Sequence, residues 1–283
     1  MGDVPERKVR VIEVKQSIFA DNDARAEALR QRLKRQGTYF INLMSSPGSG
    51  KTTTLTRLLS IMKEKYSVGV MEADIDSDVD ARTIAGCGVR SIQLHTGGMC
   101  HLDADMAAQG LEELQRSDVN AGSEVHCGSD DAERAVGIET HYGSDDADRA
   151  VGIEAHYGSA DADADESGRA GTSLDLAILE NVGNLVCPAE FDTGAALNVC
   201  ILSVPEGDDK PLKYPLMFTV CDVVLINKTD VIPYFDFDME RCVANIHMRN
   251  PKAQIFPICA RTGEGIETFA EALSTNIDEW KRA

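Results

Sequence analysis

Short runs of hydrophobic residues alternate along this chain with segments in which hydrophobic residues recur at helical spacing. The runs that predict strands cover residues 39–44, 68–73, 91–95, 174–180, 198–204, 221–227 and 254–258. Helices are predicted over 21–36, within 45–65, over 101–114 and over 266–281. Strands that are apolar on both sides are typical of a parallel sheet covered by helices on two faces. We therefore predict an α/β fold with a mostly parallel sheet and helices on both faces.

Two of these helices have a buried side that can be assigned from spacing. The stripe expected in the first helix comprises Ala24, Ala28, Leu29 and Leu33, after Asp and Asn residues suited to cap the helix start. The stripe expected in the second comprises Leu55, Leu58, Leu59 and Met62.

Residues 118–169 interrupt the alternation with an acidic repeat. HCGSDDAERAVGIET at 126–140 recurs as HYGSDDADRAVGIEA at 141–155, a period of 15. The segment lacks the bulky apolar side chains that offset the entropy cost of ordering, so we expect a disordered insertion in a single domain spanning 1–283. Alternatively, three histidines in register bind metal together with a neighbouring cysteine: His126, His141, His156 and Cys127.

The composition excludes several classes of protein. The chain has 47 acidic and 28 basic residues, a formal net charge of -19 at pH 7. Such a surface repels phosphate backbones, so we expect no nucleic-acid binding. No stretch approaches the roughly 18 apolar residues of a membrane helix, so we expect no membrane partner and a cytoplasmic location. The eight cysteines then argue against a disulfide framework, and Cys200 and Cys221 are expected in the core.

A glycine-rich turn between a strand and a helix carries the strongest motif, SSPGSGKT at 45–52. In a P-loop of this kind, backbone N–H groups surround nucleotide phosphates, Lys51 reaches the outer phosphates and the Thr52 hydroxyl binds Mg²⁺. The helix start adds its positive dipole end. The general pattern has glycine where this chain has Ser45. The predicted phosphate-binding residues are Gly48, Ser49, Gly50, Lys51, Thr52 and Thr53.

A second motif, NKTD at 227–230, follows a predicted buried strand and indicates guanine recognition. The Asp230 carboxylate can accept hydrogen bonds from N1–H and the exocyclic amine of guanine, whereas adenine offers no such donor pair. Asn227 and Lys228 complete the motif. CARTGEG at 259–265 resembles the third base-contacting loop of GTPases and places Ala260 near the base. GTP and GDP are the expected ligands.

A third motif lies in ILENVGNLVCP at 178–188. Glu180 and Gly183 have the spacing of an acid near Mg²⁺ and a glycine whose N–H meets the γ-phosphate. Asn184 stands where many GTPases have a glutamine that orients water, which suggests slow hydrolysis. Asp74, at the end of another predicted strand and preferred to Asp76, is the expected second acid near Mg²⁺. The residues expected to carry hydrolysis are Lys51, Asp74, Glu180 and Gly183.

Cys100, His101 and Cys187 suggest a transition-metal site. Thiolate and imidazole ligands suit Zn²⁺ or Ni²⁺. Adjacent residues diverge in a helix or strand, so Cys100 and His101 favour a turn or a site shared between two chains. Cys187 follows Gly183 by four residues, so contact of Gly183 with the γ-phosphate would move Cys187. The alternative is two buried cysteines and a capping histidine.

Together these segments resemble the HypB family of nickel-incorporation GTPases in hydrogenase maturation. The resemblance is carried by SSPGSGKT, EADIDSDVDARTIAGCGV, TGGMCHLDADM, ENVGNLVCP, EGDDKPLKYPLMF and NKTD, and it spans about residues 10–280 apart from the insertion. CHLDA and ENVGNLVCP distinguish it from the related urease accessory GTPase. The sequence departs from the family at 191–195, where FDTGA replaces FDLGE, and in lacking an N-terminal cysteine motif or histidine-rich run.

The resemblance implies a GTP-dependent homodimer in which Cys100, His101 and Cys187 form a nickel or zinc site at the subunit interface. It also implies a second metallochaperone as partner and delivery of nickel to the large subunit of nickel-iron hydrogenase. The alternatives are an ATP-dependent kinase or ATPase, an accessory GTPase for urease or a cobalamin enzyme, and a passive nickel store in which the nucleotide is incidental.

Overall fold

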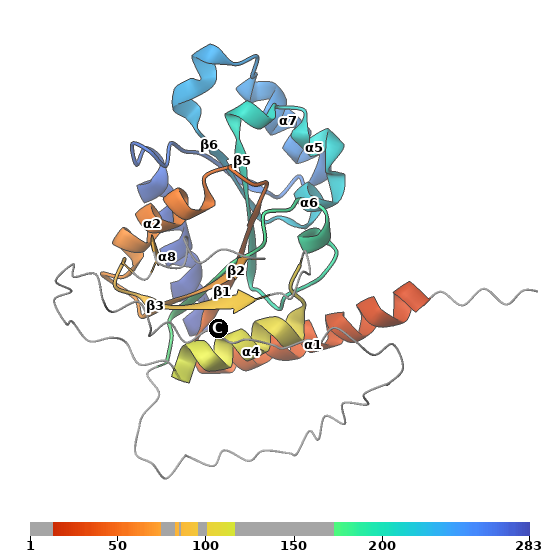
Figure 1. Cartoon of the computed structure of the whole chain (residues 1–283), viewed down its shortest axis with the longest axis vertical. Helices are drawn as coiled ribbons and strands as arrows, with labels where there is room; N and C mark the ends of the chain where they lie inside the picture. Colours follow the sequence, from red (N-terminus) through yellow and green to blue (C-terminus); the bar gives the residue numbers. More distant parts are fainter. Residues whose placement is uncertain (1–13, 75–82, 85, 96–100, 117–172) are drawn as a thin grey trace, which may run out of the picture.

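The computed structural model describes residues 14–74, 83–84, 86–95, 101–116 and 173–283 (Figure 1). The acidic repeat insertion at 118–169 and the predicted metal ligand Cys100 lie outside the described residues. The described helices include none that is long and apolar enough to cross a membrane.

A seven-stranded sheet of parallel strands forms the centre of the described structure, in the order β3-β2-β4-β1-β5-β6-β7. The strands are β1 (Tyr39–Ser45), β2 (Val68–Asp74), β3 (Arg90–His95), β4 (Leu176–Glu180), β5 (Leu197–Ser203), β6 (Val223–Asn227) and β7 (Gln254–Pro257). Leu43 is in register with Glu180, and Ser203 with Asn227. The carboxyl ends of β1, β4, β5 and β6 therefore meet along one edge, where open α/β sheets bind ligands.

Helices cover both faces of the sheet, as the hydrophobic runs predicted (Figure 1). One face packs against α2 (Lys51–Met62) and α8 (Ile266–Arg282) through side chains such as Leu55 and Phe269. The other face packs against α1 (Val14–Gln36) and α4 (Ala104–Arg116) at one end, and against α6 (Pro215–Val220) and α7 (Met239–Arg249) at the other. The shorter elements are α5 (Lys210–Lys213), η1 (Cys187–Ala189), η2 (Val204–Glu206) and η3 (Thr229–Tyr234). The predicted α/β class is confirmed.

The predicted buried side of the first helix is correct at Leu29 and Leu33 and wrong at Ala24 and Ala28. Ala24 and Ala28 are exposed, and the buried positions are Asn22, Ala26, Leu29 and Leu33. Helix α1 begins at Val14, so Asn22 lies inside the helix rather than at its start. The prediction took Asn22 as a cap of the helix start, whereas Asn22 is a polar residue on the buried side of the helix.

The start of α4 also differs from the prediction, because the helix begins at Ala104 rather than at residue 101. The Asp103 carboxylate accepts a hydrogen bond from the Met106 N–H at 2.9 Å. This is the bond of an N-cap residue, and it places His101 in the segment before the helix. The predicted stripe of α2 is confirmed, since Leu55, Leu58, Leu59 and Met62 are all buried. Cys200 and Cys221 are buried as expected.

Candidate nucleotide and metal site

The P-loop joins β1 to α2 at the ligand-binding edge of the sheet. Lys51 begins α2, and its Nζ donates to the Ser45 hydroxyl at 3.0 Å. The Ser45 hydroxyl in turn donates to the Ser46 carbonyl at 2.7 Å. Ser45 is fully buried, so its side chain is accommodated where the general pattern has glycine. The Ser49 hydroxyl is buried and has no hydrogen-bond partner among the described residues, which fits a loop shaped to bind phosphate.

Asn227 connects the P-loop by hydrogen bonds to the loop at 259–265, which is expected to contact the base. Its Nδ2 donates to the Ser49 carbonyl at 2.8 Å, and its Oδ1 accepts from the Ala260 N–H at 3.0 Å. A Cβ on Gly50 would lie 2.5 Å from Asn227 Nδ2, and Gly50 has a φ of 95°, so this position requires glycine. Lys228 Nζ donates to the Gly48 carbonyl at 2.7 Å. The P-loop and the NKTD motif are therefore joined directly by hydrogen bonds.

A cavity of about 550 Å³ opens between these loops. Its lining includes predicted residues from the P-loop region, the NKTD motif and the loop at 259–265, namely Gly50, Thr53, Asn227, Lys228, Asp230 and Ala260. The sequence analysis did not single out four further lining residues: Val231 and Tyr234 after the NKTD motif, and Cys259 and Arg261 within the predicted loop at 259–265. The volume lies within the range of small-molecule sites.

Asp230 lies in this cavity with both carboxylate oxygens engaged. Its Oδ1 accepts from the Cys259 thiol at 3.2 Å, and its Oδ2 accepts from Arg261 Nε at 3.2 Å and Nη2 at 2.9 Å. The Cys259 thiol first, and the Arg261 guanidinium second, hold the pKa of Asp230 below its ordinary value. The group is therefore an ionised acceptor at neutral pH, as recognition of a pair of N–H donors requires.

Replacement of Arg261 tests whether this ion pair competes with the base. Arg261→Ala is expected to raise GDP affinity by up to about fivefold, because exposed ion pairs of this kind are weak and must open before a base can use the carboxylate. The gain should shrink as salt is added, since salt screens the pair in the wild type. Titration with fluorescent GDP at two ionic strengths measures both effects, and a fall in affinity would contradict the competition.

The predicted Mg²⁺ and γ-phosphate residues lie on the other side of the P-loop. The Thr52 hydroxyl donates to Glu180 Oε1 at 3.3 Å. A Cβ on Gly183 would lie 3.3 Å from Pro47 Cγ and 3.4 Å from Lys51 Nζ, so the Gly183 backbone runs directly past the P-loop lysine. The structure thus brings together Lys51, Thr52, Glu180 and Gly183. Asp74 ends the neighbouring strand β2, and its side chain lies outside the described part.

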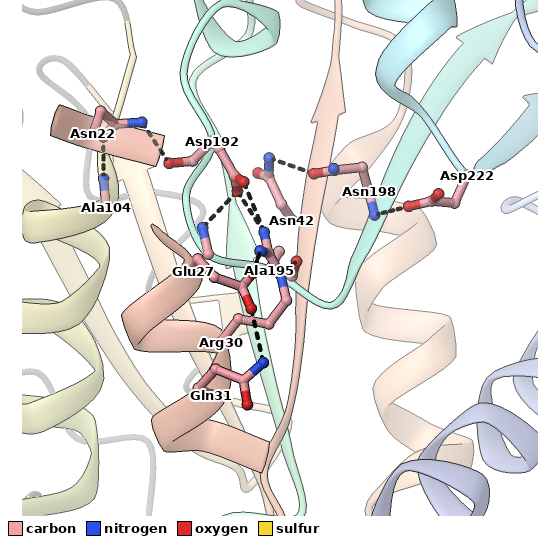
Figure 2. Close-up of polar contacts among 11 residues, drawn as sticks. Asn22, Glu27, Arg30, Gln31, Asn42, Ala104, Asp192, Ala195, Asn198 and Asp222 are labelled. Atoms are coloured by element: carbon pink, nitrogen blue, oxygen red, sulfur yellow. Dashed lines mark hydrogen bonds and ion pairs between the residues drawn. The ribbon is translucent and has the colours of Figure 1, made fainter. Parts of the chain in front are cut away.

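The turn at Asn181–Asn184 is fixed by a chain of asparagines that the sequence reasoning missed. Asn181 Nδ2 donates to Asn42 Oδ1 at 3.0 Å, and Asn42 Nδ2 donates to Asn198 Oδ1 at 3.1 Å; Figure 2 shows the second contact. Asn181 and Asn42 are buried, where amides need such partners. Asn184 Oδ1 accepts from the Val186 N–H at 2.7 Å, so this side chain supports the turn.

Of the predicted metal ligands, His101 and Cys187 lie within the described residues. Cys187 begins η1 and is partly exposed. The His101 ring stacks on Phe191, with centroids 3.9 Å apart and planes 10° from parallel. No group of three or more His, Cys, Asp or Glu side chains is placed to hold a metal within the described ranges, which exclude Cys100.

The state of His101 suits a metal ligand. Burial lowers the pKa of His101, against the opposing effect of Asp103 and Glu190. The imidazole is therefore neutral at physiological pH, which is the form that binds metals. Its Nδ1 is buried and has no hydrogen-bond partner in the part of the chain that the structure describes.

Comparison with protein families and solved structures identifies the family and the fold. The family model described as the nucleotide-binding domain of CobW/HypB/UreG matches residues 39–257. The chain belongs to the CobW/HypB/UreG family. Within this family it is similar to HypB proteins over most of its length, as the resemblance in the sequence implied.

The HypB hydrogenase maturation factor of Rhizobium leguminosarum is 38% identical over 260 residues, 92% of this chain and 69% of the relative. A protein of Helicobacter hepaticus named hydrogenase/urease maturation factor HypB is 34% identical over 93% of this chain and 86% of its own length. The crystal structure of Helicobacter pylori HypB in complex with nickel superimposes with a TM-score of 0.69 at 31% identity, covering 92% of this chain and 96% of that one.

Proposed function

We propose that this HypB-family chain is a GTP-hydrolysing nickel metallochaperone that assists nickel insertion into the large subunit of nickel-iron hydrogenase. One observation carries the proposal. The backbone at Gly183 lies against Lys51 of the P-loop, and the same segment carries Cys187 four residues later. It then reaches Phe191, which stacks on His101. A segment that senses the terminal phosphate is thus continuous with one candidate nickel ligand and in contact with another.

The nucleotide is proposed to bind with its base against Asp230 and Ala260 and its phosphates in the P-loop. Lys51 would neutralise the outer phosphate oxygens, and the Gly183 N–H would bind the γ-phosphate. Thr52 and Glu180, whose oxygens already lie 3.3 Å apart, would hold Mg²⁺ together with Asp74. The ion supplies charge neutralisation on the phosphates.

Nickel is the cargo of the proposed chaperone rather than a resident cofactor. Cys100, His101 and Cys187 are proposed to bind Ni²⁺ or Zn²⁺ in a GTP-dependent homodimer in the cytoplasm. A second metallochaperone would exchange metal with this site. Assistance to urease is a second candidate function, supported by the hydrogenase/urease maturation factor named among the relatives.

The chain is proposed to form a single domain that is interrupted by the acidic insertion at 118–169. If its histidines form a nickel store, deletion of 118–168 should lower nickel stoichiometry.

The coupling of nucleotide to nickel affinity tests the proposal. A ligand shifts a conformational equilibrium only by its differential affinity for the two states. Nickel titrations of the full chain with GDP and with a non-hydrolysable GTP analogue should therefore give affinities that differ by roughly 5- to 150-fold, the usual range of coupling between sites. Identical titrations would contradict the function. A competition assay between ATP and GTP tests the ATPase alternative, which a preference for ATP would favour.

A further inference from the structure

Helix α1 carries a buried amide that joins two other parts of the chain. Asn22 is 8% exposed; its Nδ2 donates to the Asp192 carbonyl at 2.9 Å, and its Oδ1 accepts from the Ala104 N–H at 3.0 Å (Figure 2). Asparagine is a poor helix former, and a buried amide is costly unless its donor and acceptor are both satisfied. Asn22 satisfies its donor with the segment after Cys187 and its acceptor with the start of α4.

The segment after Cys187 is held on α1 by more than this bond. Arg30 Nη2 lies 2.9 and 2.7 Å from the two Asp192 carboxylate oxygens, and Arg30 Nε donates to the Ala195 carbonyl at 3.0 Å (Figure 2). A Cβ on Gly194 would lie 2.9 Å from Leu29 Cδ2, so the backbone rests directly on the helix. Charge-assisted bonds of this kind give a fixed geometry. The end of the Cys187 segment is therefore held against α1.

The start of α4 is held on the same helix. Ala104 is the first residue of α4, and the first N–H groups of a helix have no partner within it. Asn22 supplies that partner from α1. The two helices also share a hydrophobic cluster through Leu29 and Leu111, and Arg32 pairs with Glu112 at 2.9 Å. His101, three residues before Ala104, is thereby placed relative to α1.

We infer that Asn22 is a positioning residue for the proposed nickel site. It fixes the segment that carries Cys187 to the segment that carries His101 within one chain. The stack of Phe191 on His101 lies between the two anchored ends and sets the plane of the imidazole. The inference rests on the proposed function, because it requires that His101 and Cys187 bind nickel. Asn22 itself binds no metal; it determines where the two ligands lie.

Nickel titration of the full chain tests this role, followed by the thiolate-to-nickel charge-transfer absorption. Asn22→Ala is expected to weaken nickel binding by about 10-fold or more, as loss of groups that orient metal ligands commonly does. GDP affinity should stay within about twofold, because Asn22 does not line the nucleotide cavity. Gln31→Ala is the matched control on α1, since Gln31 is exposed and its side chain contacts Glu27 on the same helix.

Asn22→Asp keeps the test valid if the alanine variant does not fold. The aspartate retains an acceptor for the Ala104 N–H but loses the donor to the Asp192 carbonyl, so nickel binding should weaken here too. Nickel affinity within about twofold of wild type in either folded variant would overturn the inference. Cys187→Ser separates the two proposals. If it leaves the absorption band and affinity intact, the nickel site itself is wrong; if it weakens both while the Asn22 variants bind normally, only the positioning role fails.

Discussion

Asp230→Asn is expected to change the base preference from guanine to xanthine. The carboxylate is acceptor-only and faces the cavity, so it suits the two N–H donors of guanine. An asparagine presents one acceptor and one donor, which match the N1–H and the 2-carbonyl of xanthine. GDP affinity should fall by about 10³-fold, because a site built for hydrogen bonds strongly rejects a mismatched partner. XDP should become the tighter ligand in parallel titrations.

The matched control is Asp236→Asn, which makes the same change of charge at an exposed position beyond η3. It should leave both affinities unchanged. An Asp230→Asn protein that binds GDP as tightly as wild type would show that the base does not contact this carboxylate. A wild type that prefers ADP would remove the guanine assignment and, with it, GTP as the ligand.

The fold was accessible from sequence because its determinants are local. The central strands, such as β4 and β6, are buried and largely apolar runs, and the P-loop motif fixes the strand, turn and helix around 39–62. The parallel pairing follows from alternation with helices. Contacts between distant segments were not accessible in this way. The order β3-β2-β4-β1-β5-β6-β7 depends on such contacts, and it was not predicted.

The candidate site could be predicted from the sequence about as far as the fold could. Gly50, Lys51, Asn227 and Asp230 belong to motifs whose chemistry is recognisable from spacing, and the structure brings them together. Asn22 gave no such signal, because a polar residue near a helix start is more often a cap than a bridge to a segment 170 residues away. The contacts of Asp192 with Arg30 likewise gave no signal in the sequence, because they join segments 162 residues apart.

Replacement of Lys51 is expected to have a large effect on GTP hydrolysis. Lys51→Ala is expected to lower the single-turnover rate of GTP hydrolysis by about 10²- to 10³-fold, the usual loss when a preorganised donor to developing charge is removed. The reason is its position: Lys51 Nζ donates a hydrogen bond to Ser45 at 3.0 Å and lies beside the Gly183 backbone, where the outer phosphate is proposed to bind. The wild-type rate should itself be slow, about 10⁻⁴ to 10⁻² s⁻¹, since Asn184 is short and supports the turn.

Lys63→Ala is the control for Lys51, because Lys63 follows the same helix and its Nζ donates to the Cys87 carbonyl at 3.0 Å, away from the cavity lining. Its hydrolysis rate should match wild type. The Lys51 variant should also lose the difference in nickel affinity between GDP and the GTP analogue, because it lacks the ammonium proposed to hold the terminal phosphate beside Gly183. Retention of that difference with hydrolysis abolished would mean that the phosphate signal reaches Cys187 without Lys51, through the Gly183 backbone alone.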